Sequence, residues 1–365
     1  MELAGQNLDY SVNGARQASC RGNELADRAQ DNITLKYFQS TSRFSQLSQA
    51  HLTALASLTA LTICVNPAET RPSREAPKPT AATPRIVSLA PSNSELLCTV
   101  GAEDEVIGVC TYCDDPHLKS VDRVGTFVSA NLERLARLNP DLIMLVSGQE
   151  QLAAKLQNNH FKTIVVDNSN LANIGKNIEQ IGRITGHHQQ AAAAARNFAV
   201  SLEAMKKIIG TSREKPRVFY CVWPQPLMTA GKKSFIDEII TTCGGINVAG
   251  DLDASYPTFS LERLLLSNPD VLILPYEARG QSFINQAPWN KLRAVQEKRV
   301  YYLPDAKNDM LSRPTLRVLK GIQWLASLLH PELAAQLRDC RISEGPAATT
   351  SCQARLSLNN VYMRN

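Results

Sequence analysis

The sequence lacks the motifs of several large enzyme classes. Its 365 residues include only six His and no HExxH pair, which argues against a zinc hydrolase. No GxSxG or GxGxxG stretch occurs, and no acid, base and nucleophile can be grouped into a catalytic set. We therefore expect a protein that is not an enzyme, with no catalytic residue, no cofactor and no resident metal ion.

Runs of like charge are also missing. The formal net charge is +5, and the excess is scattered along the chain, which predicts a soluble surface and no nucleic-acid partner. A hydrophobic content of 44% is enough for one large core or two ordinary ones, and it excludes a disordered or fibrous protein. Nine Cys are present, so at least one stays unpaired if none is lipidated. Cys340 and Cys352 could close a small loop, and the connectivity stays open.

The N-terminal part predicts export. Residues 52–66 carry an uncharged apolar run, too short to span a bilayer but suited to the core of a signal peptide; a core or amphipathic helix is the alternative. The run includes Leu61-Thr-Ile-Cys64, which resembles the lipobox of bacterial lipoproteins apart from its Ile, so Cys64 is the lipidation candidate. Residues 1–51 form an atypical polar leader, which a mis-set translation start would explain. The Pro-rich residues 67–84 predict a linker.

One stretch of the chain occurs twice. Residues 131–146 (NLERLARLNPDLIMLV) recur at 260–275 as SLERLLLSNPDVLILP, with Glu133 and Glu262 at the same place, 129 residues apart (262 − 133). Each copy predicts a short helix that begins at a polar cap and ends before Pro, then a buried strand. Two such units predict two similar lobes, and a cleft between lobes is a common ligand site.

Strands and helices alternate along the folded part, which predicts an α/β fold with mainly parallel sheets. From position 187 to 209 no Gly or Pro occurs and apolar side chains recur at helical spacing, which predicts one long helix. We expect four parts: an N-terminal lobe (85–186), an interlobe helix (187–210), a C-terminal lobe (211–335) and a loose polar tail (336–365).

Five stretches between Arg85 and Pro331 carry a resemblance to a known family: RIVSLAPSNSELL, GVCTYCDDP, VGTFVSANLERLARLNPDLI, PLMTAGKKSFIDEIITTCGGINVA and YPTFSLERLLLSNPDVLIL. They resemble the substrate-binding proteins of bacterial ABC importers for cobalamin, siderophores and haem, and most of all the cobalamin-binding branch. The resemblance implies a fold like that of class III periplasmic binding proteins. In that fold two lobes, each with a central sheet, are joined by one long helix, and the ligand lies between them.

The resemblance also implies ligand contacts. A flat, mostly apolar macrocycle edged with amides suits aromatic faces and a few polar anchors; the alternative is that the aromatic residues belong to the core. The cobalamin branch pairs the Cys of its CGG stretch with a Cys in the C-terminal helix. Cys243 is present here, but the matching stretch GIQWLASLL has no Cys. The residues that match or lie close to ligand-contacting positions are Tyr112, Phe127, Trp223, Tyr256, Asp309 and Arg313.

Glu133 and Glu262 have two interpretations. In the family, the corresponding carboxylates, one on each lobe, meet basic residues of the two permease subunits. A Glu in the first turn of a helix also stabilises the helix through the macrodipole, by about 0.3 to 1 kcal/mol. Both roles can hold together.

Other ligands and another class stay open. The same fold could bind a ferric siderophore, for which Arg313 is the main basic candidate, or haem with Tyr112 as axial ligand. A two-lobed metal-cluster enzyme component would use Cys ligands, which are scattered here. Cys110-Thr-Tyr-Cys113 with His117 has the spacing of a metal or redox site, but a second Cys pair is missing.

The sequence thus predicts a monomeric, extracytoplasmic solute-binding protein, either periplasmic or held at the membrane by a lipid anchor. We expect it to capture a corrinoid and to deliver it to the permease subunits of an ABC importer.

Overall fold

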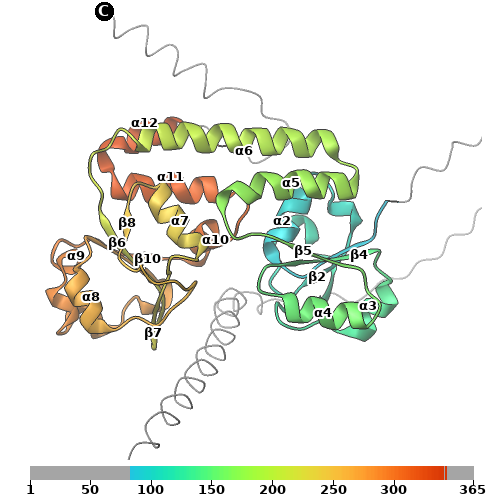
Figure 1. Ribbon diagram of the computed structural model, residues 1–365, viewed down its shortest axis with the longest axis horizontal. Coiled ribbons are helices and arrows are strands. Elements are labelled where there is room, and N and C mark those ends of the chain that lie inside the picture. The colour runs from blue at the N-terminus through green and yellow to red at the C-terminus, as the bar shows by residue number, and fades with distance from the viewer. Residues whose placement is uncertain (1–82, 341, 343–365) are drawn as a thin grey trace, which may run out of the picture.

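The computed structural model describes residues 83–340 and residue 342. They form two lobes, and helix α6 (His188–Ile209) runs along one side of both (Figure 1). The polar leader, the apolar run with Cys64, most of the linker, and Cys352 with the rest of the tail lie outside the described residues.

The first lobe is built on a five-stranded, fully parallel sheet in the order β3-β2-β1-β4-β5. Side chains alternate between its faces: Ile86 and Met144 join the apolar cluster under α2 and α5, whereas Val87 and Ile143 join the one under α3 and α4 (Figure 1). Both faces are covered, which explains why β4 is apolar along its whole length. The strands are β1 (Ile86–Ser88), β2 (Val106–Cys110), β3 (Asp122–Gly125), β4 (Leu142–Val146) and β5 (Thr163–Val166). The helices are α2 (Pro91–Thr99), α3 (Leu132–Leu138), α4 (Glu150–Asn158) and α5 (Leu171–Thr185).

The second lobe has a sheet in the order β10-β9-β6-β7, with β8 also paired to β6. All of its pairings are parallel except that of β6 with β7. The strands are β6 (Arg217–Pro224), β7 (Leu227–Thr229), β8 (Ile246–Asn247), β9 (Val271–Pro275) and β10 (Val300–Leu303). The α-helices are α7 (Phe235–Thr242), α8 (Leu261–Ser267), α9 (Arg293–Gln296), α10 (Asp305–Ser312), α11 (Val318–Leu329) and α12 (Ala334–Asp339). The predicted α/β fold with two mainly parallel sheets is confirmed.

Helix α6 lies where the sequence predicts the interlobe helix. Its 22 residues span about 33 Å at 1.5 Å per residue. It packs along α5 of the first lobe and against α11 and α12 of the second. Gly182 of α5 faces Ala191 of α6 so closely that a Cβ on Gly182 would lie 2.2 Å from the Ala191 methyl carbon. Among the described residues, no helix is both long and apolar enough to cross a membrane.

The two copies of the repeated stretch fold in the same way. Asn131 and Ser260 begin α3 and α8, and each side chain accepts the backbone N–H three residues on, at 2.9 and 3.1 Å. Both helices end at an Asn in the left-handed conformation, with φ of 43° at Asn139 and 39° at Asn268. Asn tolerates this conformation better than most residues, so the Asn-Pro-Asp triplet turns each chain from helix to strand.

The Asp of each triplet then fixes the unit to the first strand of its lobe. The Asp141 carboxylate accepts the backbone N–H of Arg85 at 2.8 Å, and the Asp141 N–H donates to the Arg85 carbonyl at 2.8 Å. Asp270 and Arg217 make the same pair of bonds, both at 2.8 Å. These bonds set the register of β1 with β4 and of β6 with β9.

Two predictions about local structure are wrong. The stretch Ser92-Asn-Ser-Glu95 has the pattern of a capping box, which predicts Ser92 as a helix cap; instead the cap of α2 is Ala90, two residues earlier, with Pro91 in the first turn and no side-chain bond at the cap. Pro suits the first helical turn because its missing N–H would have no partner there. The loose tail does not begin at 336, because α12 continues to Asp339 and Leu337 is fully buried.

The repeated carboxylate predicts a matched pair of stability effects. We expect Asp141→Ala to lower the free energy of unfolding by about 1–2 kcal/mol, because a backbone N–H loses a charged acceptor. Asp270→Ala should cost up to about 1 kcal/mol more, since Asp270 also pairs with Arg293 at 2.8 Å. Urea unfolding measures both. Asp104→Ala, at an exposed acid of the first lobe, is the control, and equal midpoints for all three variants would contradict the expectation.

Candidate functional site

The predicted ligand residues gather at the carboxyl ends of the strands in both lobes. Tyr112 and Phe127 each lie two residues beyond a strand of the first lobe, β2 and β3. In the second lobe Trp223 is the penultimate residue of β6. Tyr256 lies in the long loop between β8 and α8, which bridges to Met228 through Thr258. In α/β proteins, ligands bind in crevices at this edge of a sheet.

Two further predicted residues follow the last strand of the second lobe. Asp309 lies in α10, which begins two residues after β10, and Arg313 is the C-cap residue of that helix. Both are buried, with 8% and 4% of their surface exposed. The structure thus places all six predicted ligand residues in segments at or after strand ends.

The aromatic residues are held against one apolar cluster that spans both lobes. Tyr112 is part of it, and Phe127, Trp223 and Tyr256 pack against it as partly buried residues. Tyr112 is thus a core residue, whereas Phe127, Trp223 and Tyr256 are partly exposed at the edge of the cluster. Burial raises the pKa of Tyr256 above its ordinary value, so its phenol stays neutral and able to donate a hydrogen bond.

Gln149 fixes the loop that carries Phe127. Its side-chain amide donates to the carbonyls of Phe127 (2.5 Å) and Leu89 (3.2 Å), and its oxygen accepts the N–H of Val146 at 2.9 Å. One buried amide therefore ties together the segments that follow β1, β3 and β4. The indole N–H of Trp223 donates to the Gln225 carbonyl at 2.7 Å, which orients this ring in the second lobe.

Arg313 is buried and joins the two lobes through ion pairs to a buried Glu and a half-exposed Asp. Its Nη1 lies 2.7 Å from Glu95 Oε1 of α2 and 2.6 Å from Asp114 Oδ1 in the loop after β2, and its Nη2 lies 3.0 Å from Asp309 Oδ2. Arg317 adds a second guanidinium, with Nη1 at 2.9 Å from Glu95 Oε1. We call these five residues the interlobe network. It shows that the segments beyond β2 and β10 lie against each other.

The network contains more negative than positive groups, because three carboxylates share two guanidiniums. Burial raises the pKa of Asp309 to about 6; Arg313 opposes this shift, whereas the charge of Asp114 adds to it. Burial by itself would lower the pKa of Arg313, but the hydrogen bond to Asp114 and the charges of Asp309 and Glu95 raise it above the ordinary value. Arg313 is therefore a permanent cation, and Asp309 is the member that can take up a proton.

A second polar contact joins the lobes near the start of α5. The backbone N–H of Leu171 donates to Glu238 Oε2 of α7 at 2.7 Å. The contact also caps an N–H at the start of α5 that has no partner within the helix.

The sequence did not predict the network. The sequence indicates Asp309 and Arg313 only as ligand contacts and Glu95 only as part of a capping box, and it gives no role to Asp114 or Arg317. Glu95 carried a usable signal, because it is a charged residue beside two leucines in the helix after the first strand. Its partners, however, lie 218 and 222 positions away, beyond the reach of any local pattern.

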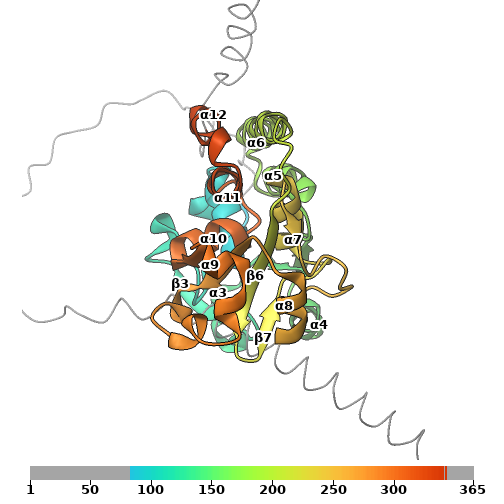
Figure 2. The same ribbon diagram turned by 90° about the vertical axis from the view of Figure 1, so that its left-hand side faces the viewer.

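Glu133 and Glu262 lie away from these groups. Each is an exposed residue in the first turn of its helix, α3 or α8. Both helices lie in the half of the molecule remote from α6 (Figures 1 and 2). The two helices that carry these carboxylates therefore lie on one side of the molecule, one in each lobe.

Both cysteines of the motif Cys110-Thr-Tyr-Cys113 are buried, and their sulfur atoms lie 3.0 Å apart. His117 does not join them but contacts Asp115, close to Cys98. Burial, with the charge of Asp115, raises the pKa of the Cys98 thiol to about 12, so this thiol is protonated when no cation lies beside it. Cys243 is also buried and lies 3.6 Å from the Ile322 carbonyl in the helix that lacks its family partner.

Asp309 predicts a pH dependence of stability. Its pKa is raised from 3.8 to about 6 in the folded protein, so the folded state binds this proton more tightly. The free energy of unfolding therefore falls as pH rises through that window. Asp309→Asn removes the titration. Relative to the wild type, we expect the free energy of unfolding of Asp309→Asn to be about 1–3 kcal/mol higher at pH 7 than at pH 4, since one pKa unit corresponds to about 1.4 kcal/mol. Urea unfolding at both pH values measures this, and an unchanged difference would contradict it.

Sequence comparison relates the chain to binding proteins. Residues 86–306 match the periplasmic binding protein family. The vitamin B12-binding protein of Vibrio campbellii is 30% identical over 258 residues, which is 70% of this chain and 91% of that protein. An uncharacterised ABC transporter substrate-binding lipoprotein of Bacillus subtilis is 28% identical over 258 residues, 68% of this chain and 80% of that protein.

Solved structures agree on the fold. The crystal structure of the periplasmic vitamin B12-binding protein of Vibrio cholerae matches with a TM-score of 0.60 and 27% identity, over 70% of this chain and 98% of that one. The periplasmic haem-binding protein of Roseiflexus matches with a TM-score of 0.61 and 20% identity, over 69% and 100%, which is a likeness of fold alone. Since the family match spans more than half of the 365 residues, the chain belongs to the periplasmic binding protein family.

Proposed function

We propose that this protein captures a corrinoid between its lobes and delivers it to the permease of an ABC importer, without catalysing a reaction. The observation that carries the proposal is the gathering of the six predicted ligand residues in segments at or after the strand ends of both lobes. The relatives named as vitamin B12-binding proteins support the same ligand.

The chemistry of these residues suits a corrin ring. Phe127 belongs to the first lobe and Trp223 and Tyr256 to the second, and all three are partly exposed, so they can contact a flat apolar ligand and still pack against the protein. The neutral phenol of Tyr256 and the buried Asp309 and Arg313 are candidates for hydrogen bonds to the amides at the edge of the ring.

The interlobe network weighs against anionic ligands. A ferric siderophore or the propionates of haem would need a free cation, and Arg313 was the main candidate. Its guanidinium instead pairs with Glu95, Asp114 and Asp309. With Arg317 included, the network has three carboxylates and two guanidiniums, so one negative charge is left over. Such a surrounding repels a second anion, whereas the uncharged amides of a corrinoid meet no such repulsion.

The proposed route of delivery starts outside the cytoplasm. We infer a periplasmic or otherwise extracytoplasmic monomer, with Cys64 as the candidate for a lipid anchor. Glu133 and Glu262, exposed on two helices at one side of the molecule, would then pair with basic residues of the two permease subunits. A single carboxylate on each lobe suits a partner with two similar subunits.

Ligand capture is tested by titrating purified protein with cyanocobalamin and following the quenching of Trp fluorescence or the heat of binding. We expect Trp223→Ala and Tyr256→Ala each to weaken binding by about 5- to 150-fold, because the loss of an aromatic contact with the ligand costs about 1–3 kcal/mol. Trp289→Ala is the matched control, since Trp289 packs within the second lobe against Phe283. Retention of haem or a ferric siderophore, with no binding of cyanocobalamin, would overturn the ligand while leaving the fold untouched.

Delivery is tested separately from capture. We expect Glu133→Ala combined with Glu262→Ala to leave the affinity for cyanocobalamin unchanged and to abolish its uptake by cells that depend on this protein. A Glu203→Ala change, at an exposed Glu of α6, should alter neither. Normal uptake by the double variant would leave the two Glu with only their role at the helix ends.

A further inference from the structure

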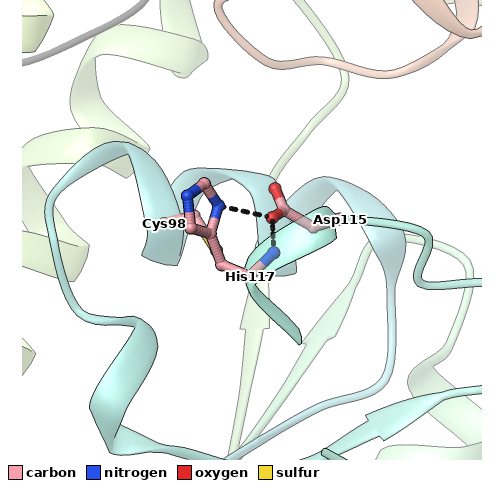
Figure 3. Close-up of side chains that lie close together, drawn as sticks. All are labelled: Cys98, Asp115 and His117. Carbon is pink, nitrogen blue, oxygen red and sulfur yellow. Dashed lines mark hydrogen bonds and ion pairs between the residues drawn. The ribbon is translucent and has the colours of Figure 1, made fainter. Parts of the chain in front are cut away.

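Three side chains with different metal-binding atoms converge beside the interlobe network. Cys98 lies in the last turn of α2, and Asp115 and His117 lie at a short 3-10 helix, η3 (Pro116–Leu118) (Figure 3). One donor atom of each, the thiol sulfur, a carboxylate oxygen and a ring nitrogen, lies within 4.8 Å of the other two. We call these three residues the Cys98 cluster.

The loop that carries two of them is firmly held. Asp115 Oδ1 accepts the backbone N–H of His117 at 2.9 Å and so caps η3. The guanidinium of Arg123 donates to the carbonyls of Cys113, Leu118 and Val121 at 3.0 to 3.1 Å. The positions of Asp115 and His117 relative to α2 are therefore set by the fold rather than by the cluster itself.

The separation of the His117 and Asp115 donor atoms suits a tetrahedral ion. His117 Nδ1 lies 2.9 Å from Asp115 Oδ1. Two such atoms, each about 2.1 Å from one zinc ion in tetrahedral geometry, lie about 3.4 Å apart. A shift of about half an ångström would thus replace the hydrogen bond by two bonds to the metal. The imidazole of His117 is mostly exposed, at 67%, so it can make this shift without disturbing the core.

The donor set selects the kind of ion. A thiolate and an imidazole favour zinc and other thiophilic ions, whereas calcium and magnesium prefer oxygen ligands. One thiolate and one carboxylate together balance the charge of a divalent cation. Three protein ligands leave a fourth position for water or another ligand.

The surroundings leave room for that fourth ligand. The Cys98 cluster lines a cavity of about 390 Å³, whose opposite wall comes from α10, α11 and the segment between them in the second lobe. A water molecule occupies about 30 Å³ of liquid, so the cavity easily holds one on the ion. None of the six residues proposed for corrinoid binding lines this cavity, and the Cys98 cluster is therefore a separate site.

From this geometry we propose that Cys98 Sγ, Asp115 and His117 bind a zinc ion or a similar thiophilic divalent cation. The ion would fasten the end of α2 to the loop after β2. That loop also carries Tyr112 of the proposed ligand site and Asp114 of the interlobe network. The ion would thus stiffen the first-lobe side of the contact between the lobes.

The test uses the full chain without a polyhistidine tag, reduced and freed of metal, and cobalt(II) as a spectroscopic substitute for zinc. We expect one cobalt ion to give a sulfur-to-metal charge-transfer band with the strong visible bands of tetrahedral cobalt. Cys98→Ser should abolish the charge-transfer band. Asp115→Asn and His117→Ala should each weaken zinc binding at least tenfold in competition with a chromophoric chelator, since even outer-shell changes cost about 10–100-fold.

Matched controls separate this site from other donors. Asp104→Asn and His188→Ala, at an exposed acid and an exposed His elsewhere on the protein, should bind zinc like the wild type. A charge-transfer band that survives Cys98→Ser, or zinc affinity equal in wild type and His117→Ala, would overturn the proposal and leave Asp115 as a helix cap only. Circular dichroism checks folding. Should Cys98→Ser fail to fold, His117→Ala decides, because its side chain is mostly exposed.

Discussion

The arrangement of the two lobes depends on one buried guanidinium. Arg313 meets Glu95 and Asp114 of the first lobe and Asp309 of its own; Arg313, Glu95 and Asp309 are buried, whereas Asp114 lies at the edge, in contact with water. Taking these charges out of water is costly, and only close pairing offsets the cost. Any relative movement that separates the lobes at this point would leave a buried charge unpaired. The network therefore specifies how the lobes meet more than it adds to their stability.

Duplication explains why the lobes resemble each other. Both lobes contain the same series of features: a polar cap, a short helix, an Asn in the left-handed conformation and an Asp bonded to the first strand. None of these steps needs a contact from the other lobe. The unit can therefore be used twice while the loops after the strands differ, and those loops supply the candidate ligand residues and the network.

What could be predicted from the sequence follows from the range of the interactions. The repeated helix and strand and α6 depend on neighbours a few positions apart, so periodicity and caps reveal them. The parallel sheets pair strands that lie far apart in sequence, and they were predictable only because strands and helices alternate along the chain. Glu95 looked like part of a capping box because Ser92 stands three residues before it, but Pro91 starts the helix earlier and the carboxylate turns to Arg313. His117 looked like a partner of Cys110 and Cys113, yet the loop after β2 carries it to Cys98. The segment around Leu337 is polar and so predicts a loose tail. Leu337 is buried because α12 packs against α11 and α6, which its own segment does not reveal. The position of each of these residues is determined by partners distant in sequence or by packing, which a local pattern does not show.

The close contact of Gly182 with Ala191 has a mechanical consequence. A Cβ on Gly182 would not fit there, so the close packing resists sliding of α5 along α6 and ties α6 to the first lobe. A change in the angle between the lobes must then be taken up at the far end of α6, in the segment from Gly210 to Pro216, and where α6 touches α11 and α12. The packing therefore favours a pivot where α6 meets the second lobe over one where it meets the first.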